Sequence, residues 1–287
     1  MAFTPMVPAG GILGYRLLTS TEGVQREVFD RQPEIARETA YFREKIASVA
    51  SAADLVTDRR LLAVALGAFG LDEDIDKQAF VRKILEEGTD EANSMANRLV
   101  DPRYKRFAES FGFGNATGAQ TARIGFSDRI VSAYNERQFE VSVGEQDETL
   151  RIALNFRREI ARYANATDPD GTAWFSVMGD EAVREVFDVA FGLGSSFGQL
   201  DIDRQRDDLR DMNDRYFGNT SLEIFKEPEM VDKMIDRYLA RKSIENGPSA
   251  LTPGMAALTL LNASNGLGET SIQNIVLSSI GRFRSSL

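Results

Sequence analysis

Apolar residues recur along this chain at the three- and four-residue spacing that marks one face of an α-helix. Over residues 59–69 they form a single apolar face, made of Leu61, Leu62, Ala65, Leu66 and Phe69. Asp58 precedes this segment as a candidate N-cap, and Gly70 follows it as a candidate stop. The pattern predicts a helix whose two ends are specified by the sequence.

Two further segments show the same order of N-cap residue, apolar helix face and terminating glycine. One follows Asp76 and ends before Gly88, and the other follows Asp101-Pro102 and ends at Gly112. Proline at the first helical position is compatible with a helix start, because that N–H has no partner within the helix. Both segments therefore predict helices.

Strand signals are scarce. Residues 139–143 (FEVSV) alternate apolar and polar positions, but they lie inside a run that reads as helix from about residue 128 to 164. We therefore expect an all-α protein.

The sequence also contains an internal repeat pattern. When it is shifted by 114 positions, residues 32–47 match residues 146–161 at seven of sixteen positions. With a shift of 122, residues 58–71 match residues 180–193 at six of fourteen positions, including Ala-Phe-Gly-Leu (AFGL). An alternative is that the matches reflect only the apolar pattern that all amphipathic helices share. That pattern does not explain why helix caps and terminating glycines also match, in the same order. The pattern predicts a tandem duplication whose two copies pack together.

The duplication gives a domain plan. We expect a flexible N-terminal segment over residues 1–19, helical repeat one over 20–114, a linker over 115–126, helical repeat two over 127–246, and C-terminal helices over 247–287. The last of those helices has an apolar face, which either docks on its own domain or binds a partner helix. The candidate partner-binding residues are Ile272, Ile275, Val276, Ile280 and Phe283.

The amino-acid composition limits the kinds of reaction and binding site that the protein can have. The chain has 287 residues and contains neither cysteine nor histidine, so disulfides, thiol nucleophiles and the usual neutral-pH base are excluded. Its formal net charge is −10 and it has no block of Lys and Arg, which argues against a nucleic-acid partner. We expect no cofactor, no metal and no enzymatic activity.

The motifs that suggest ligands all have simpler explanations. Residues 112–118 (GFGNATG) follow a helix rather than a strand, so they favour helix termination over nucleotide binding. The acidic stretches 72–77 and 201–208 lack the glycine and glutamate of a common calcium loop, and we interpret them as helix caps. Trp174 is expected to anchor the core.

The longest apolar run, residues 61–71, is far shorter than the roughly 20 residues of a membrane-spanning helix. The first fifteen residues carry no Lys or Arg, so they lack the charged start of a secretory signal. We expect the protein to be cytoplasmic, or to be exported without a cleaved signal peptide.

Four segments are similar to known sequences: residues 14–71, 94–114 (SMANRLVDPRYKRFAESFGFG), 174–193 (WFSVMGDEAVREVFDVAFGL) and 235–242 (IDRYLARK). Together they resemble an alphaproteobacterial family of uncharacterised domains whose members are often encoded among flagellar genes. The resemblance implies an association with the flagellum or its assembly. It supplies no catalytic residue.

Three functions are compatible with these observations. The leading hypothesis is a non-enzymatic, flagellum-associated structural or accessory protein that acts through contacts with a protein partner or with itself. The alternative is a cytoplasmic chaperone or regulator of flagellar assembly. The third is an enzyme that uses carboxylates, which would need an enclosed cleft with converging acids.

Overall fold

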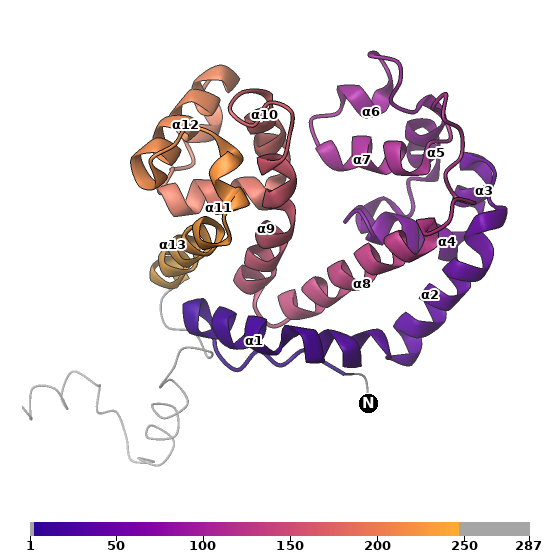
Figure 1. The fold of residues 1–287 in the computed structure, drawn as a ribbon, viewed down its shortest axis with the longest axis horizontal. Coiled ribbons are helices and arrows are strands. Elements are labelled where there is room, and N and C mark those ends of the chain that lie inside the picture. Colours follow the sequence, from indigo (N-terminus) through magenta and orange to yellow (C-terminus); the bar gives the residue numbers. More distant parts are fainter. Residues whose placement is uncertain (1–2, 247–287) are drawn as a thin grey trace, which may run out of the picture. The chain divides into compact units, whose positions relative to one another are not determined.

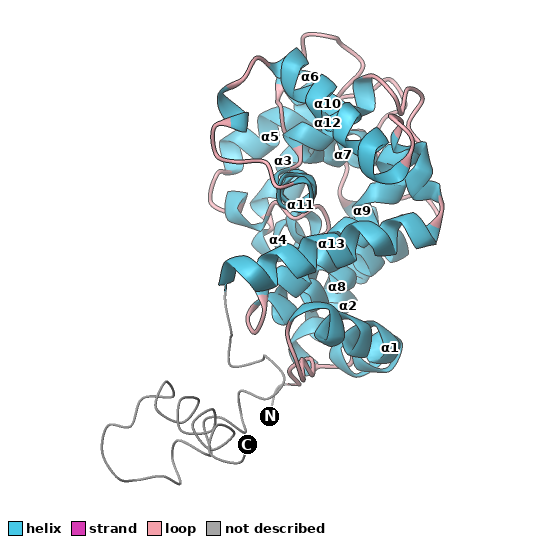
Figure 2. Cartoon of the chain, turned by 90° about the vertical axis from the view of Figure 1, so that its left-hand side faces the viewer, coloured by secondary structure: helices cyan, strands magenta, loops and turns pink. Residues whose placement is uncertain are grey.

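The computed structural model describes residues 3–246, and every regular element in that range is helical (Figure 1). The all-α prediction is confirmed. The α-helices are α1 (Gly11–Asp30), α2 (Pro33–Lys45), α3 (Ala52–Thr57), α4 (Arg59–Gly67), α5 (Gln78–Glu87), α6 (Met95–Arg98), α7 (Pro102–Phe111), α8 (Phe126–Gly144), α9 (Glu148–Ala164), α10 (Thr172–Gly179), α11 (Glu181–Phe191), α12 (Ile202–Phe217) and α13 (Pro228–Asn246). Short 3-10 helices are η1 (Ile46–Ser48), η2 (Asp72–Asp74), η3 (Phe197–Gln199) and η4 (Leu222–Lys226). Figure 2 shows the same helices joined only by loops and turns.

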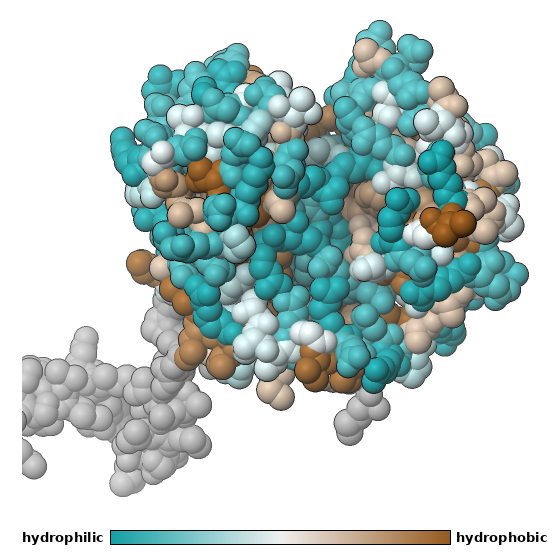
Figure 3. Space-filling model, viewed as in Figure 1, coloured by the Kyte–Doolittle hydropathy of each residue, from teal (hydrophilic) through white to brown (hydrophobic). Residues whose placement is uncertain are grey.

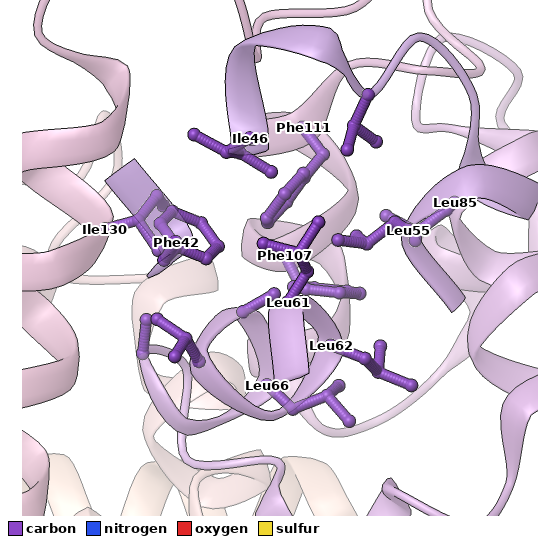
Figure 4. Close-up of a cluster of buried hydrophobic side chains, with 14 of the residues drawn as sticks. Phe42, Ile46, Leu55, Leu61, Leu62, Leu66, Leu85, Phe107, Phe111 and Ile130 are labelled. Atoms are coloured by element: carbon purple, nitrogen blue, oxygen red, sulfur yellow. The ribbon is translucent and has the colours of Figure 1, made fainter. Parts of the chain in front are cut away.

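Helices α2–α7 surround one apolar core, and we call this group lobe A. Its centre is built from buried side chains that come from α2, η1, α3, α4, α5, α7 and the first half of α8 (Figure 4). The labelled members are Phe42, Ile46, Leu55, Leu61, Leu62, Leu66, Leu85, Phe107, Phe111 and Ile130. Burial of these side chains supplies most of the driving force for docking the short helices of lobe A.

Helices α9–α13 form a second group, lobe B, whose core is aromatic. The ring of Phe187 lies 5.2 Å from that of Trp174 and 5.7 Å from that of Phe156, both in edge-to-face geometry. Trp174 is completely buried, and its indole N–H donates to the carbonyl oxygen of Thr220 at 3.1 Å. The expectation that Trp174 anchors the core is confirmed.

Two long helices connect the lobes. α8 packs on α2 and α4 of lobe A and on α9 of lobe B, and α1 contacts α2, α8, α9 and α13 (Figure 1). No helix within residues 3–246 combines the length and the apolar character needed to cross a membrane.

Most of the predicted helix starts are confirmed. The Asp58 side chain accepts hydrogen bonds from the backbone N–H groups of Arg60 and Leu61, and Asp101 accepts one from Arg103. Gly112 ends α7 with a φ of +69°, which is a conformation that few residues other than glycine adopt. The segment 112–118 therefore terminates a helix, as expected.

Two acidic positions do not cap helices as predicted. Asp76 forms an ion pair with Arg59 at 2.7 Å, and α5 begins two residues later without a side-chain cap. Asp74 is buried, where it binds Lys77 and accepts a hydrogen bond from the hydroxyl of Tyr104. Asp201, in contrast, caps α12 as expected.

The expected flexible segment over residues 1–19 is wrong from Gly11 onward, because α1 begins there. Tyr15 and Leu18 are buried on one side of this helix, and Gly14 lies against the backbone of Ala9. The glycines that suggested irregular structure instead permit this close approach.

The helix expected over residues 128–164 is also wrong in one respect, because it is two helices. α8 ends at Gly144, and α9 begins after Asp147, whose carboxylate accepts hydrogen bonds from the N–H groups of Thr149 and Leu150. The alternating residues 139–143 lie within α8.

The two AFGL segments end their helices in similar ways. Gly70 and Gly192 both have positive φ, at +70° and +72°. A guanidinium group donates to the alanine carbonyl two residues earlier in each segment, from Arg137 to Ala68 and from Arg237 to Ala190, both at 3.1 Å. These shared features agree with a duplication, which itself stays a prediction.

Gly70 supplies a test of this packing. An added methyl group there would meet Nη1 of Arg137 at 2.5 Å, in a backbone conformation that disfavours other residues. We expect Gly70→Ala to lower the free energy of unfolding by about 1–2 kcal/mol in urea titrations. Gly23→Ala is the control, because Gly23 is exposed within α1 and its added methyl meets nothing within 4 Å. That change should stabilise the protein by about 0.5–1 kcal/mol, and equal effects at both sites would contradict this account.

Candidate functional site

The most concentrated chemistry in the described chain is a group of charged side chains where α7 of lobe A meets lobe B. We call this group the charged junction. It comprises Arg106 from α7, Arg137 and Glu140 from α8, Arg158, Glu159 and Tyr163 from α9, and Asp180 at the start of α11. Helical spacing places Arg137 beside Glu140 and Glu159 beside Tyr163, since these pairs are three and four residues apart on their helices.

Glu159 is the centre of the charged junction and is 1% exposed. Its Oε1 lies 2.8 Å from Nη2 of Arg137, and its Oε2 lies 3.4 Å from Nη2 of Arg106. Arg158 also contacts the same carboxylate. One buried carboxylate is therefore shared by guanidinium groups from three helices.

Two further links surround this centre. Arg158 binds Glu140 through two parallel hydrogen bonds of 2.8 and 2.9 Å. The hydroxyl of Tyr163 donates to Asp180 at 2.7 Å and accepts from Arg106 at 3.2 Å. Because Asp180 also caps α11, the charged junction fixes the start of that helix.

Protonation states follow from these contacts. Burial alone would raise the pKa of Glu159, but the surrounding guanidinium groups outweigh it and lower the pKa to about 2. Burial, together with the neighbouring Arg158, lowers the pKa of Arg137 to about 10. Both groups therefore remain charged at neutral pH.

The charged junction is better suited to stabilising the fold than to acid–base catalysis. A general base needs a pKa near the working pH, and Glu159 is far below it. Burial and the adjacent Asp180 raise the pKa of Tyr163, so its hydroxyl keeps its proton. The charged junction holds α7, α8 and α9 together, and the described residues give it no free acid or base.

Other candidate sites are weaker. An open depression of about 610 Å³ lies at the elbow between α3 and α4, lined by residues that include Asp54, Asp58 and Arg60. Each of these already has a partner: Asp54 accepts a hydrogen bond from the N–H of the α3 cap Ser51, Asp58 caps α4, and Arg60 binds Glu38 at 2.8 Å. Within residues 3–246, no group of three or more acidic side chains is arranged to hold a metal ion.

The strongest surface feature lies on α1, where four of the five exposed large apolar side chains lie along one side of the helix. Leu13, Leu17, Val24 and Val28 are 51%, 42%, 71% and 43% exposed. At 100° per residue they fall within an arc of about 60°, so they form one stripe along the helix. We call these four residues the α1 stripe. Figure 3 shows apolar residues along the lower edge of the described body, where Figure 1 places α1.

The opposite side of α1 explains why the α1 stripe faces outward. Tyr15, Leu18 and Phe29 are buried against the rest of the protein. Glu22 and Arg26 form ion pairs with Arg157 of α9 and Glu136 of α8. Since these contacts fix the rotation of α1, the α1 stripe is held at the surface.

The sequence did not lead to either feature. The residues predicted to bind a partner, Ile272, Ile275, Val276, Ile280 and Phe283, lie outside the described residues, so that prediction stays a prediction. Three residues of the charged junction lie in FRREIARY (residues 156–163), a segment whose pattern indicated only a repeat. The α1 stripe was missed because its first two residues, Leu13 and Leu17, fall in residues 1–19, which were expected to be flexible.

The charged junction predicts a large cost for neutralising its centre. Glu159→Gln leaves three guanidinium groups, on side chains only 11–15% exposed, short of a counter-charge. We therefore expect the free energy of unfolding at pH 7 to fall by about 3–5 kcal/mol. Glu86→Gln, which disrupts a half-exposed pair with Arg82 on α5, should change it by less than about 0.5 kcal/mol.

The same variant predicts a pH dependence. A lowered carboxyl pKa contributes stability above the unfolded-state pKa, near 4.5, and that contribution disappears as pH falls toward 2. The difference in stability between wild type and Glu159→Gln should therefore shrink over this pH range. A difference that stays constant down to pH 2.5 in urea titrations would show that Glu159 is not held ionised by its neighbours.

Comparison with known proteins identifies relatives but no function. No protein of curated function matches the chain. A crystal structure of protein AGR_C_984 from Agrobacterium tumefaciens is similar, with 30% sequence identity and a TM-score of 0.68, covering 82% of this chain and 94% of that one.

A family pattern matches residues 68–231, which is more than half of the chain and includes every residue of the charged junction but none of α1. The chain belongs to the family described as protein of unknown function DUF1217.

Proposed function

We propose that this is a non-enzymatic, flagellum-associated protein that acts through protein–protein contacts, and that the α1 stripe is its contact surface. The observation that carries the proposal is the exposure of four large apolar side chains on one helix face. Single exposed apolar residues are normal on protein surfaces, but a contiguous row of them marks an interaction site.

The chemistry of the described residues supports a binding role. The buried carboxylates of the charged junction are bound by guanidinium groups, and Asp58, Asp101 and Asp147 are engaged as helix caps. The enzyme hypothesis needs an unpaired acid in an enclosed cleft, whereas the acidic side chains that stand out in this structure already have partners.

The flagellar part of the proposal rests on two sequence features. One is the resemblance to a family often encoded among flagellar genes. The other is the absence of cysteine, which suits a protein that passes unfolded through an export channel. A cytoplasmic chaperone or regulator of flagellar assembly would share both features, so cellular location separates the two possibilities.

Fractionation of the host bacterium tests the proposal. We expect immunoblots to find the protein in purified hook–basal bodies or in the culture supernatant of the wild type, and to lose it there in a strain without the flagellar export ATPase. Recovery only in the soluble cell fraction of both strains would favour the chaperone or regulator.

A surface variant connects location to the α1 stripe. Leu17→Glu combined with Val24→Glu places two charges on the stripe and should reduce the amount in the flagellar fraction by roughly 10-fold or more. Ile124→Glu is the matched control, because Ile124 is fully exposed in a loop away from α1. If both variants fractionate like the wild type, the α1 stripe is not the contact surface.

A further inference from the structure

We propose that the partner of the α1 stripe is a second copy of this chain, with the two α1 helices antiparallel about a two-fold axis level with Ser20 and Thr21. This inference rests on the proposed function, because it names what the same surface binds. It is carried by the symmetry of the stripe, by the small residues at its centre and by the charges beside it.

The α1 stripe is palindromic in position. Leu17 and Val24 each lie about 5 Å along the helix from the midpoint between Ser20 and Thr21, and Leu13 and Val28 each lie about 11 Å from it. In an antiparallel pair centred on this midpoint, Leu17 meets Val24 of the second copy and Leu13 meets Val28. Every exposed apolar residue of the stripe therefore obtains an apolar partner, as a two-fold interface requires.

The centre of the stripe permits two helices to approach closely. Ser20 and Thr21 have small side chains, and both hydroxyls donate to the carbonyl oxygen of Leu17, at 2.8 and 3.0 Å. Because these hydroxyls already have acceptors in their own helix, covering them leaves no unpaired donor.

Charges beside the stripe match as well. Arg16 and Glu27 lie on the same flank of the helix, 47% and 68% exposed at the side chain. In the antiparallel pair the same flanks of the two helices face each other, and Arg16 lies about 3 Å along the axis from Glu27 of the second copy. The two-fold axis generates this opposite-charge pair twice.

Arg16 is also held in place for such a pair. Its guanidinium group binds Asp232 at 3.3 Å and Asp236 at 2.8 Å, both on α13. Since nearly half of the side chain remains exposed, it has room for a further carboxylate. An unrelated partner helix would have to reproduce both the apolar spacing and these charges, whereas a second copy supplies them by symmetry.

Sedimentation of the full chain over a concentration series tests for the dimer. We expect a reversible monomer–dimer equilibrium whose dissociation constant rises roughly 100-fold or more in Leu17→Glu, since two buried leucines are lost per dimer. Ile124→Glu should leave the equilibrium unchanged. Unaltered circular dichroism and urea unfolding of each monomer will show that the variants are folded.

Single cysteines test the orientation, because the chain has none of its own. In the antiparallel pair, the two copies of residue 20 lie about 1.5 Å apart along the axis and the two copies of residue 31 about 31 Å apart. A short bis-maleimide should therefore cross-link Ser20→Cys to its own copy but not Arg31→Cys, whose side chain is 74% exposed in the wild type.

Each outcome has a defined meaning. A dimer that is lost in Leu17→Glu, together with cross-linking at position 20 alone, supports the proposal. A full chain that is monomeric at every concentration overturns it, as does a dimer that persists in Leu17→Glu or cross-links equally at both positions. If the chain is monomeric and the α1 variants are nevertheless lost from the flagellar fraction, the self-pairing is refuted. The proposed function then stands, with a different protein as the partner of the α1 stripe.

Discussion

The burial of one carboxylate, that of Glu159, constrains the arrangement of the described helices. A charge removed from water is tolerated only where opposite charges and hydrogen bonds replace the lost hydration. For Glu159 these come from α7, α8 and α9 itself, so all three helices must be docked before the charge is satisfied. Apolar burial drives the formation of each lobe, but this ion cluster specifies how α7 of lobe A meets lobe B.

The charged junction and α1 differ in how much of each is occupied by contacts within the protein. The charged side chains of the junction bind one another, whereas only one side of α1 packs against the rest of the protein. Tyr15, Leu18 and Phe29 hold it in place, and the α1 stripe is left available. The family match covers the charged junction and stops short of α1. The segment that matches the family and the proposed contact surface are therefore different parts of this chain.

The sequence predicted local features well and their combination poorly. Asp58, Asp101 and Gly112 were recognised because caps and stops depend on a few neighbouring residues. The break at Asp147 was missed although Gly144 and the capping Asp147 mark it, because residues 128–164 were interpreted as one continuous helix. Glu159 looked like any other acid in a charged chain, and only tertiary contacts set it apart. The exposed side of α1 was equally hidden, since sequence alone does not say which of two apolar faces is covered.

Arg137 has a consequence for how the protein unfolds. Its Nε binds the carbonyl oxygen of Ala68 in lobe A, while its Nη2 binds Glu159 in lobe B. Unfolding of either lobe therefore breaks one of the two hydrogen bonds that hold the Arg137 side chain in place. Local melting of one lobe therefore exposes an uncompensated charge in its neighbour, which makes partly folded intermediates costly. The two lobes should lose structure together, as a single cooperative unit rather than as two independent domains.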